Sequence, residues 1–265
     1  MPARREKRSD RESRGRPQRS PTAPPVGSAR PARSTRRPPR DSSRDSIERV
    51  LGRQDWSRVR SLIPRSAADP ALALGRLREF CARVITWNRR VSNLISKNDE
   101  ARIVARHLVE SLAHAKWLVE NDREDWIDFG SGPGFPALPL AIVGVGSRWT
   151  LVESRRIKTL FLRKTLGDMG IENGKKVINA RLESVAESGS LFNGFTARAA
   201  GDLGETLRLA AGIVTVGGSA FLWKGSRGTA EMEASREWAT SWDFDDGRAI
   251  GEGGAVLFRF IRRNR

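Results

Sequence analysis

The stretch DFGSGPGFP at residues 128–136 decides the fold of this 265-residue chain. The apolar run at 126–129 that leads into it has the length of a short strand, and the apolar residues at 139–143 belong to a following helix. Three glycines stand at alternate positions between strand and helix, where side chains would collide with a ligand that approaches the backbone. We therefore predict a ligand-binding turn at Gly130, Gly132 and Gly134.

The spacing of the turn distinguishes between two kinds of ligand. A dinucleotide fingerprint reads G-x-G-x-x-G, whereas this turn reads G-x-G-x-G, and Pro133 and Pro136 remove two amide donors that a pyrophosphate would use. Asp128 suits the cationic amino group of a methionine moiety, and Glu153, at the predicted end of the second strand, suits the two hydroxyls of a ribose. These features favour S-adenosylmethionine, while an NAD site and a purely structural glycine turn stay open as alternatives.

Strands and helices alternate downstream of the turn. We expect strands at 126–129, 149–152, 177–180, 195–199 and 220–223, helices at 156–169, 205–211 and 229–240, and two final strands at 242–244 and 255–261. This order predicts an α/β fold with a Rossmann-like, doubly wound, mostly parallel sheet that ends in an antiparallel hairpin. Such an ending favours a class I methyltransferase over a dehydrogenase.

The sequence upstream of the turn predicts helices only. Apolar residues recur at helical spacing over 46–64, 70–94 and 103–119. We divide the chain into a disordered basic arm at 1–45, a basic, RNA-facing helical region at 46–122 and a methyltransferase domain at 123–265. The single cysteine, Cys81, falls on the apolar stripe of the second helix, which predicts a core position and excludes an internal disulfide.

The charge of the chain points to a polyanionic partner. Lys and Arg number 48 against 31 Asp and Glu, a formal charge of +17, and residues 1–45 hold 14 basic and 5 acidic residues. That arm is read either as a loose RNA contact or as a solubilising tail. No apolar run approaches the ~20 residues that cross a bilayer, so we expect no membrane partner and a cytoplasmic protein.

The absence of certain groups restricts the chemistry. Methylation of pyrimidine C5 needs a cysteine nucleophile, and the loop that commonly serves exocyclic amines, Asn/Asp-Pro-Pro-aromatic, does not occur. His107 and His114 alone cannot complete a metal site, and we expect structural roles for them and no metal. Guanine N7 carries a free lone pair, so its methylation requires alignment and no general base.

The residues quoted above resemble the RsmG (GidB) family, bacterial methyltransferases of guanine N7 in small-subunit (16S) ribosomal RNA. The resemblance covers about residues 70–262 and is strongest at DFGSGPGFPALPLAI, residues 128–142. Further matching segments are Leu151–Ser154, Arg181–Glu183, Thr196–Ala199, Trp223–Gly225, Trp87-Asn88, Asn93-Leu94, Arg106-His107 and Ser111-Leu112. Departures occur at Glu110, Ala137 and Ser96, where the family usually has aspartate, glycine and threonine.

The resemblance implies roles for particular residues. It implies cofactor contacts at Gly130, Phe135, Leu182, Glu183 and Arg198, in addition to Asp128, Gly132, Gly134 and Glu153 from the turn and the second strand. Arg198 and Lys224 are expected as positioning residues in catalysis; alternatively Arg198 satisfies carboxylates at the sheet edge and Lys224 is an exposed turn residue. The implied partner is small-subunit ribosomal RNA or the 30S particle, with the enzyme as a monomer. A class I methyltransferase of a small molecule or a protein is the alternative function.

Overall fold

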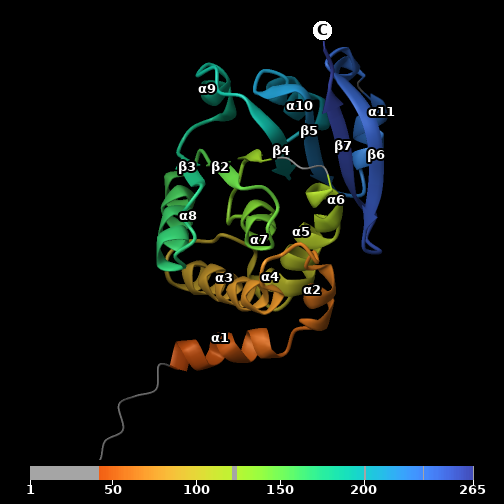
Figure 1. Cartoon of the computed structure of the whole chain (residues 1–265). Coiled ribbons are helices and arrows are strands. Elements are labelled where there is room, and N and C mark those ends of the chain that lie inside the picture. The colour runs from red at the N-terminus through yellow and green to blue at the C-terminus, as the bar shows by residue number, and fades with distance from the viewer. Residues whose placement is uncertain (1–41, 121–123, 200, 235, 265) are drawn as a thin grey trace, which may run out of the picture. The chain divides into compact units, whose positions relative to one another are not determined.

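Seven strands form one mixed sheet in the order β3-β2-β1-β4-β5-β7-β6 (Figure 1). The structure, a computed structural model, describes residues 42–120, 124–199, 201–234 and 236–264. The strands are β1 (Asp125–Phe129), β2 (Arg148–Val152), β3 (Lys175–Ile178), β4 (Phe192–Arg198), β5 (Val214–Lys224), β6 (Trp242–Ile250) and β7 (Ala255–Arg262). Strands β1 to β5 are parallel to one another, and β7 is antiparallel to both β5 and β6. The predicted mostly parallel sheet with an antiparallel hairpin at its end is confirmed.

The strand order places the glycine turn where ligands of such sheets gather. β1 lies between β2 and β4, so the chain passes to opposite sides of β1 and leaves a crevice at the carboxyl ends of these strands. The turn at 130–136 leaves β1 at this edge. Glu153 follows β2 and Arg198 ends β4, so the sheet alone brings three predicted site segments together.

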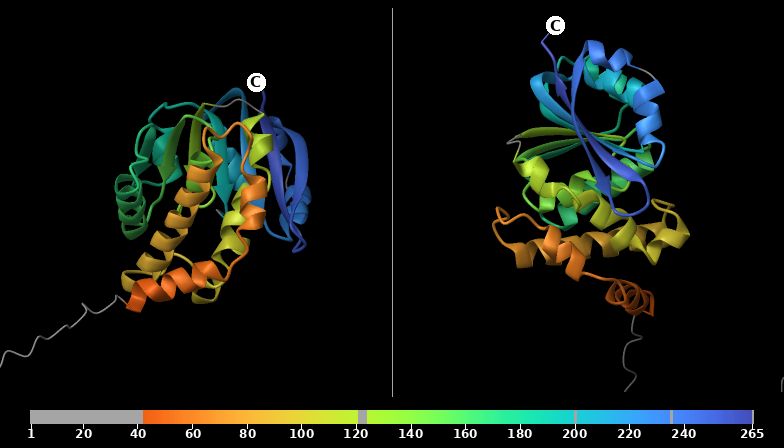
Figure 2. Two further views of the ribbon diagram at one scale, coloured as in Figure 1. Left: turned by 60° about the horizontal axis from the view of Figure 1, so that its bottom comes forward. Right: turned by 90° about the vertical axis from the view of Figure 1, so that its right-hand side faces the viewer.

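Helices cover both faces of the sheet. Those connecting the strands are α7 (Ala137–Ile142), α8 (Arg156–Asp168), α9 (Leu182–Ala186), α10 (Leu203–Ala210), α11 (Gly228–Ala234) and the 3₁₀-helix η2 (Glu237–Thr240). Figure 2 shows α10 and α11 on one side of the sheet and the N-terminal helices on the other. The single helix expected at 229–240 is wrong, because this segment is divided into α11 and η2. α9 was not predicted, because an apolar pattern over five residues is too short to recognise.

The N-terminal helices are α1 (Ser42–Gly52), α2 (Ser57–Leu62), α3 (Pro70–Arg90), α4 (Lys97–Glu100), η1 (Val104–Val109), α5 (Glu110–Leu112) and α6 (Ala115–Val119). α3 begins as its sequence predicts, because Pro70 occupies the first turn and the Asp69 carboxylate accepts from the amides of Ala71 and Leu72. The single helix predicted at 103–119 is wrong. It is divided into a π-helix, η1, and two short α-helices, with His114 leaving the helical conformation between them.

The helical region and the sheet share one core. Buried residues of α1 to α3 and of η1 to α7 pack in a single cluster with Trp126, Trp149 and Phe221 of the sheet, and Cys81 lies in this cluster, as predicted. The described residues form one compact unit. The predicted domain boundary at 122 falls within residues 121–123, and residues 1–41 of the predicted arm also lie outside the described residues. None of the described helices is both long and apolar enough to span a membrane.

Gly194 of β4 gives a direct test of this core. It pairs with Trp126 on β1, and a Cβ at this position would lie 2.5 Å from the Trp126 ring, which stacks on Trp149. Gly194→Ala is expected to lower the free energy of unfolding by about 1–3 kcal/mol, measured by denaturant unfolding, because two packed indole rings must move.

The matched control is Gly167→Ala in α8, where a Cβ meets nothing within 4 Å. This substitution should stabilise the protein by about 0.5–1 kcal/mol, because alanine favours the helix. Equal effects at the two positions would contradict the packing described for Trp126.

Candidate active site

Two hollows meet at Gly130 on the carboxyl edge of the sheet. The larger has a volume of about 700 Å³ and is lined by residues that include Gly132, Phe135, Arg198 and Lys224. The smaller, of about 190 Å³, lies between the end of β2 and the start of α9. Gly130 lines both, so a single extended ligand can pass from one hollow to the other across this glycine.

The glycine turn is built in left-handed conformations. The φ angles are +66° at Gly130, +55° at Gly132 and +95° at Gly134, which other residues adopt at a cost. A Cβ at Gly132 would make only ordinary contacts, with the Gly130 carbonyl oxygen at 3.6 Å and Lys158 Nζ at 3.9 Å. A Cβ at Gly134 would instead lie 2.8 Å from Leu138, and Gly134 lines neither hollow. The structure thus gives Gly134 a packing role, whereas Gly130 and Gly132 border the hollows.

Glu153 ties the end of β2 to the turn. Its carboxylate is buried and accepts hydrogen bonds from the amide of Gly132 at 2.9 Å and from the amide of Arg155 at 2.7 Å. Each oxygen therefore has one protein donor and can accept another. Leu182 and Glu183, in the first turn of α9, line the smaller hollow together with Phe129.

Asp128 lies buried at the end of β1, directly before the turn. Its Oδ1 accepts from the Thr196 hydroxyl at 2.6 Å, while Oδ2 has no partner among the described residues. Burial raises the pKa of this carboxyl to about 7, and the hydrogen bond from Thr196 opposes that rise. A buried carboxylate oxygen without a donor is costly, so this position favours a cationic donor nearby.

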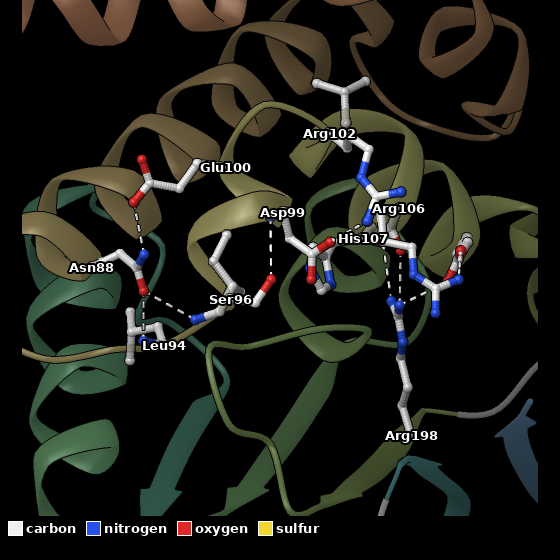
Figure 3. A network of polar contacts seen from close by, with 12 residues as sticks. Asn88, Leu94, Ser96, Asp99, Glu100, Arg102, Arg106, His107 and Arg198 are labelled. Carbon is white, nitrogen blue, oxygen red and sulfur yellow. Dashed lines mark hydrogen bonds and ion pairs between the residues drawn. The ribbon is translucent and has the colours of Figure 1, made fainter.

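Arg198 connects the end of β4 to the helical region (Figure 3). Its guanidinium donates to the carbonyl of Arg106 at 2.8 Å, to the carbonyl of His107 at 3.2 Å and to the Glu110 carboxylate at 2.7 Å. A further bond reaches the Ser111 hydroxyl at 3.3 Å. The contacts of Arg198 thus agree with the alternative role given above, in which it satisfies a carboxylate at the sheet edge. Its side chain also lines the larger hollow. Its contact with a ligand stays a prediction.

Lys224 at the end of β5 is also held by the protein. Its Nζ donates to the Gly201 carbonyl at 2.7 Å and to the Glu231 carboxylate at 2.9 Å. The side chain is 8% exposed, so the alternative of an exposed turn residue is wrong. Lys224 lines the larger hollow, as a positioning residue must.

His107 on η1 lines the larger hollow and was not among the predicted site residues. Its ring stacks on Phe135 with centroids 5.2 Å apart, and its Nε2 lies 3.6 Å from an Asp99 oxygen. Burial, followed by the charge of Arg198, lowers the pKa of His107 to about 4, so the ring is neutral near pH 7. The motif Arg106-His107 could have indicated that His107 belongs to the site. It was not predicted there, because a lone histidine on an apolar helix face is more often structural.

Asp99, Arg106, Glu110 and Lys158 are further polar residues of the larger hollow that were not among the predicted site residues. Among the residues that the structure describes, no three His, Cys, Asp or Glu side chains are grouped so as to hold a metal ion.

Comparison with known proteins agrees with this architecture. A model of the family described as rRNA small subunit methyltransferase G (GidB) matches residues 73–247. The chain is 35% identical over 157 residues to ribosomal RNA small subunit methyltransferase G of Stenotrophomonas maltophilia strain K279a, covering 59% of this chain and 71% of that protein. It is 33% identical over 158 residues to the protein of the same name from Xanthomonas campestris pv. campestris strain B100, covering 60% and 72%.

Among solved structures, a variant of MtNAS in complex with S-adenosylmethionine is similar with a TM-score of 0.51, covering 83% of this chain and 89% of that chain at 16% identity. This likeness concerns the fold alone, and it agrees with the predicted class I methyltransferase fold.

The buried carboxyl of Asp128 predicts a specific pH dependence. The folded protein keeps this proton up to about pH 7, whereas the unfolded chain releases it near pH 4. Between these values the folded state binds more protons, so the contribution of Asp128 to stability falls as the pH rises, by about 1.4 kcal/mol per pH unit at most.

Asp128→Asn removes this titration. The free energy of unfolding of the variant minus that of the wild type, measured without ligand from pH 4 to pH 8, should therefore increase by a few kcal/mol. Thr196→Val should move the titration midpoint of Asp128 in the folded protein to higher pH, because the Thr196 hydroxyl stabilises the charged carboxylate. A difference that does not vary with pH would contradict the buried state of Asp128.

Proposed function

The chain belongs to the family of rRNA small subunit methyltransferase G, S-adenosylmethionine-dependent enzymes that methylate guanine N7 in 16S ribosomal RNA, and we propose that the two hollows joined at Gly130 are its active site. The observation that carries the proposal is the meeting of both hollows at this glycine, on the carboxyl edge of the sheet. The alternative substrates, a small molecule or a protein, are excluded by the family.

The residues around the turn fit the cofactor. The smaller hollow, with Leu182 and Glu183, suits the adenosine end, and Glu153 has lone pairs for the ribose hydroxyls. The unpartnered Oδ2 of Asp128 suits the charged amino group of the methionine end. When bound, S-adenosylmethionine supplies a methyl group on a sulfonium centre. Gly130, Gly132 and Phe135 then form the border between the cofactor and the rest of the larger hollow.

In this proposal the residues of the larger hollow align the target guanine with the cofactor and provide no general base. Guanine N7 needs no proton removed, and the pKa of about 4 keeps His107 neutral at the pH at which the lone pair of N7 is free. Arg198 and Lys224 are both bound to protein carbonyls and carboxylates, which supports a positioning role for each. We propose that Arg198 acts mainly by fixing η1, and with it His107 and Phe135, around the target base.

In this proposal the RNA contacts the N-terminal helical region. Arg102 and Arg106, with side chains 63% and 54% exposed, lie in the part of the chain that borders the larger hollow. Such cations suit phosphate contacts. We propose further that the RNA-facing surface belongs to residues 46–122, that the basic arm at 1–45 adds phosphate contacts, and that the enzyme acts as a cytoplasmic monomer on the 30S particle.

Substitution of Gly132 tests the proposal. Gly132→Ala should weaken S-adenosylmethionine binding at least tenfold in calorimetry, because its Cβ would point into the space beside the turn. Transfer of labelled methyl groups into small subunits that lack the modification should fall in parallel, and mapping of the wild-type product should find N7-methylguanine in 16S rRNA.

The matched control is Gly170→Ala, whose φ of +60° imposes a similar backbone strain and whose Cβ meets nothing within 4 Å. Both variants should lose about 1–2 kcal/mol of stability, and only Gly132→Ala should lose the cofactor. Wild-type affinity in Gly132→Ala, or label found in protein and not in RNA, would refute the proposal.

A further inference from the structure

One cation of the larger hollow has no carboxylate partner among the described residues. The side chains that line this hollow and are cationic near pH 7 are Arg106, Lys158, Arg198 and Lys224. Glu110 forms ion pairs with Arg106 and Arg198, each at 2.7 Å. Glu231 forms an ion pair with Lys224 at 2.9 Å. The side chain of Lys158, in contrast, has neither an ion pair nor a hydrogen bond to any residue that the structure describes.

The remaining carboxylate of the hollow does not compensate this charge. Asp99 is the third acidic residue of the lining, and it is paired with Arg102 at 2.8 Å. The hollow therefore carries an excess positive charge, which lies at Lys158. A solvated lysine needs no partner, so the position of this cation decides whether it has a ligand.

Lys158 lies beside the glycine turn on the side of β2. It belongs to the first turn of α8, the helix that follows β2, and the residue is partly buried. Its Nζ is 3.9 Å from the place that a Cβ of Gly132 would take. The ammonium group thus reaches the turn at which, in the proposed function, the cofactor is bound.

The cofactor has no anion to offer at this position. S-adenosylmethionine carries a single anionic group, the carboxylate of its methionine end. Asp128, assigned above to the amino group of that end, is bonded to Thr196 of β4, and Arg198 ends the same strand. β1 separates β4 from β2, so the carboxylate is expected on the far side of the turn from Lys158. An anion bound by Lys158 must then come from the second substrate.

Other donors on this side of the hollow are already used. The amides of Leu94 and Ile95 donate to the side chain of Asn88 at 2.7 and 3.0 Å. The amide of Gly132 donates to the carboxylate that follows β2, as described above. Among these lining residues, the ammonium group of Lys158 keeps its three donors for a ligand.

The cationic character continues from the hollow to the surface. Arg155 and Arg156 directly precede Lys158 in the turn of the chain and are exposed. Their guanidinium groups, too, have no ion pair with any described residue. Three cations within four residues suit a ligand with several negative charges, such as the phosphates of a nucleic acid strand.

We propose that Lys158 binds a backbone phosphate of the ribosomal RNA strand at the target guanine, and that Arg155 and Arg156 attract the strand toward it. This inference rests on the proposed function, since it takes the substrate to be RNA and the larger hollow to hold the guanine. It extends the RNA-binding surface from the helical region at 46–122 onto α8, beside the cofactor.

The first test measures the binding of small subunits against salt concentration. Lys158→Gln should reduce the slope of log affinity against log salt by about 0.7, the contribution of one phosphate contact to a single strand. KM for the RNA should rise about three- to tenfold, as for the loss of one partly exposed charged contact. Lys158→Arg keeps the charge and should keep the slope. The affinity for S-adenosylmethionine without RNA, measured by calorimetry, should equal that of the wild type in both variants.

The matched control is Lys176→Gln, which removes an exposed lysine of β3 that lines neither hollow of the active site. Both glutamine variants should keep the wild-type melting temperature, because neither lysine side chain has a partner among the described residues. An equal change of slope in both, or no change in Lys158→Gln, would overturn the proposal. Weaker binding of S-adenosylmethionine by Lys158→Gln would also overturn it, because the cation would then serve the cofactor.

A second test locates the RNA directly. The single cysteine, Cys81, is fully buried, so Lys158→Cys introduces one accessible thiol that can carry a photoactivatable cross-linker. Cross-links should map to nucleotides adjacent to the target guanine, and the same probe at Lys176→Cys should give none there. Cross-links from position 158 that map far from this guanine, or none at all, would contradict the proposal. Wild-type protein that fails to methylate 16S rRNA would instead overturn the proposed function, so the two failures are distinguishable.

Discussion

The hydrogen bonds of the Arg198 guanidinium connect the two halves of the active site. Arg198 ends a central parallel strand, and its fixed fork of donors reaches two main-chain carbonyls of η1 and the Glu110 carboxylate. A π-helix leaves carbonyls displaced from regular α-helical pairing, and such elements are frequent at functional sites. Arg198 donates to two of these carbonyls, those of Arg106 and His107, and η1 in turn holds His107 against Phe135. This side chain thus joins η1 to the sheet edge, in addition to the hydrophobic core that the helical region and the sheet share.

The remaining parts of the site follow from the sheet. Parallel strands bring Asp128, Glu153 and Arg198 to one edge, and Glu153 draws the glycine turn toward β2 through the amide of Gly132. Loop 91–97, fixed by Asn88, closes the larger hollow from the helical side. In the proposed function, cofactor and RNA therefore approach from different layers of the molecule and meet at the border formed by Gly130 and Phe135.

The sequence predicts those features that rest on local patterns. The turn, the alternation of strands and helices, and the N-terminal start of α3 each follow from residues close together in the chain, and each is confirmed. The division of the segment at 103–119 into η1, α5 and α6 was missed, because the donors from Arg198 that η1 requires come from 88 or more residues away. The contacts of Lys224 could not be predicted for the same reason, since its partners are Gly201, in the loop after β4, and Glu231, in α11.

Amide hydrogen exchange of residues 104–112 in Arg198→Lys, measured together with turnover on small subunits, tests the central claim most directly. Lysine cannot reproduce the fork, so we expect faster exchange in this segment together with turnover reduced about 10- to 1000-fold, equivalent to ~1.4–4 kcal/mol of lost alignment. Glu110→Gln, which replaces the charged acceptor by a neutral one, should change both quantities in the same direction and by less. Reduced turnover with exchange at the wild-type rate would contradict the account, because Arg198 would then act by touching a ligand and not by fixing η1.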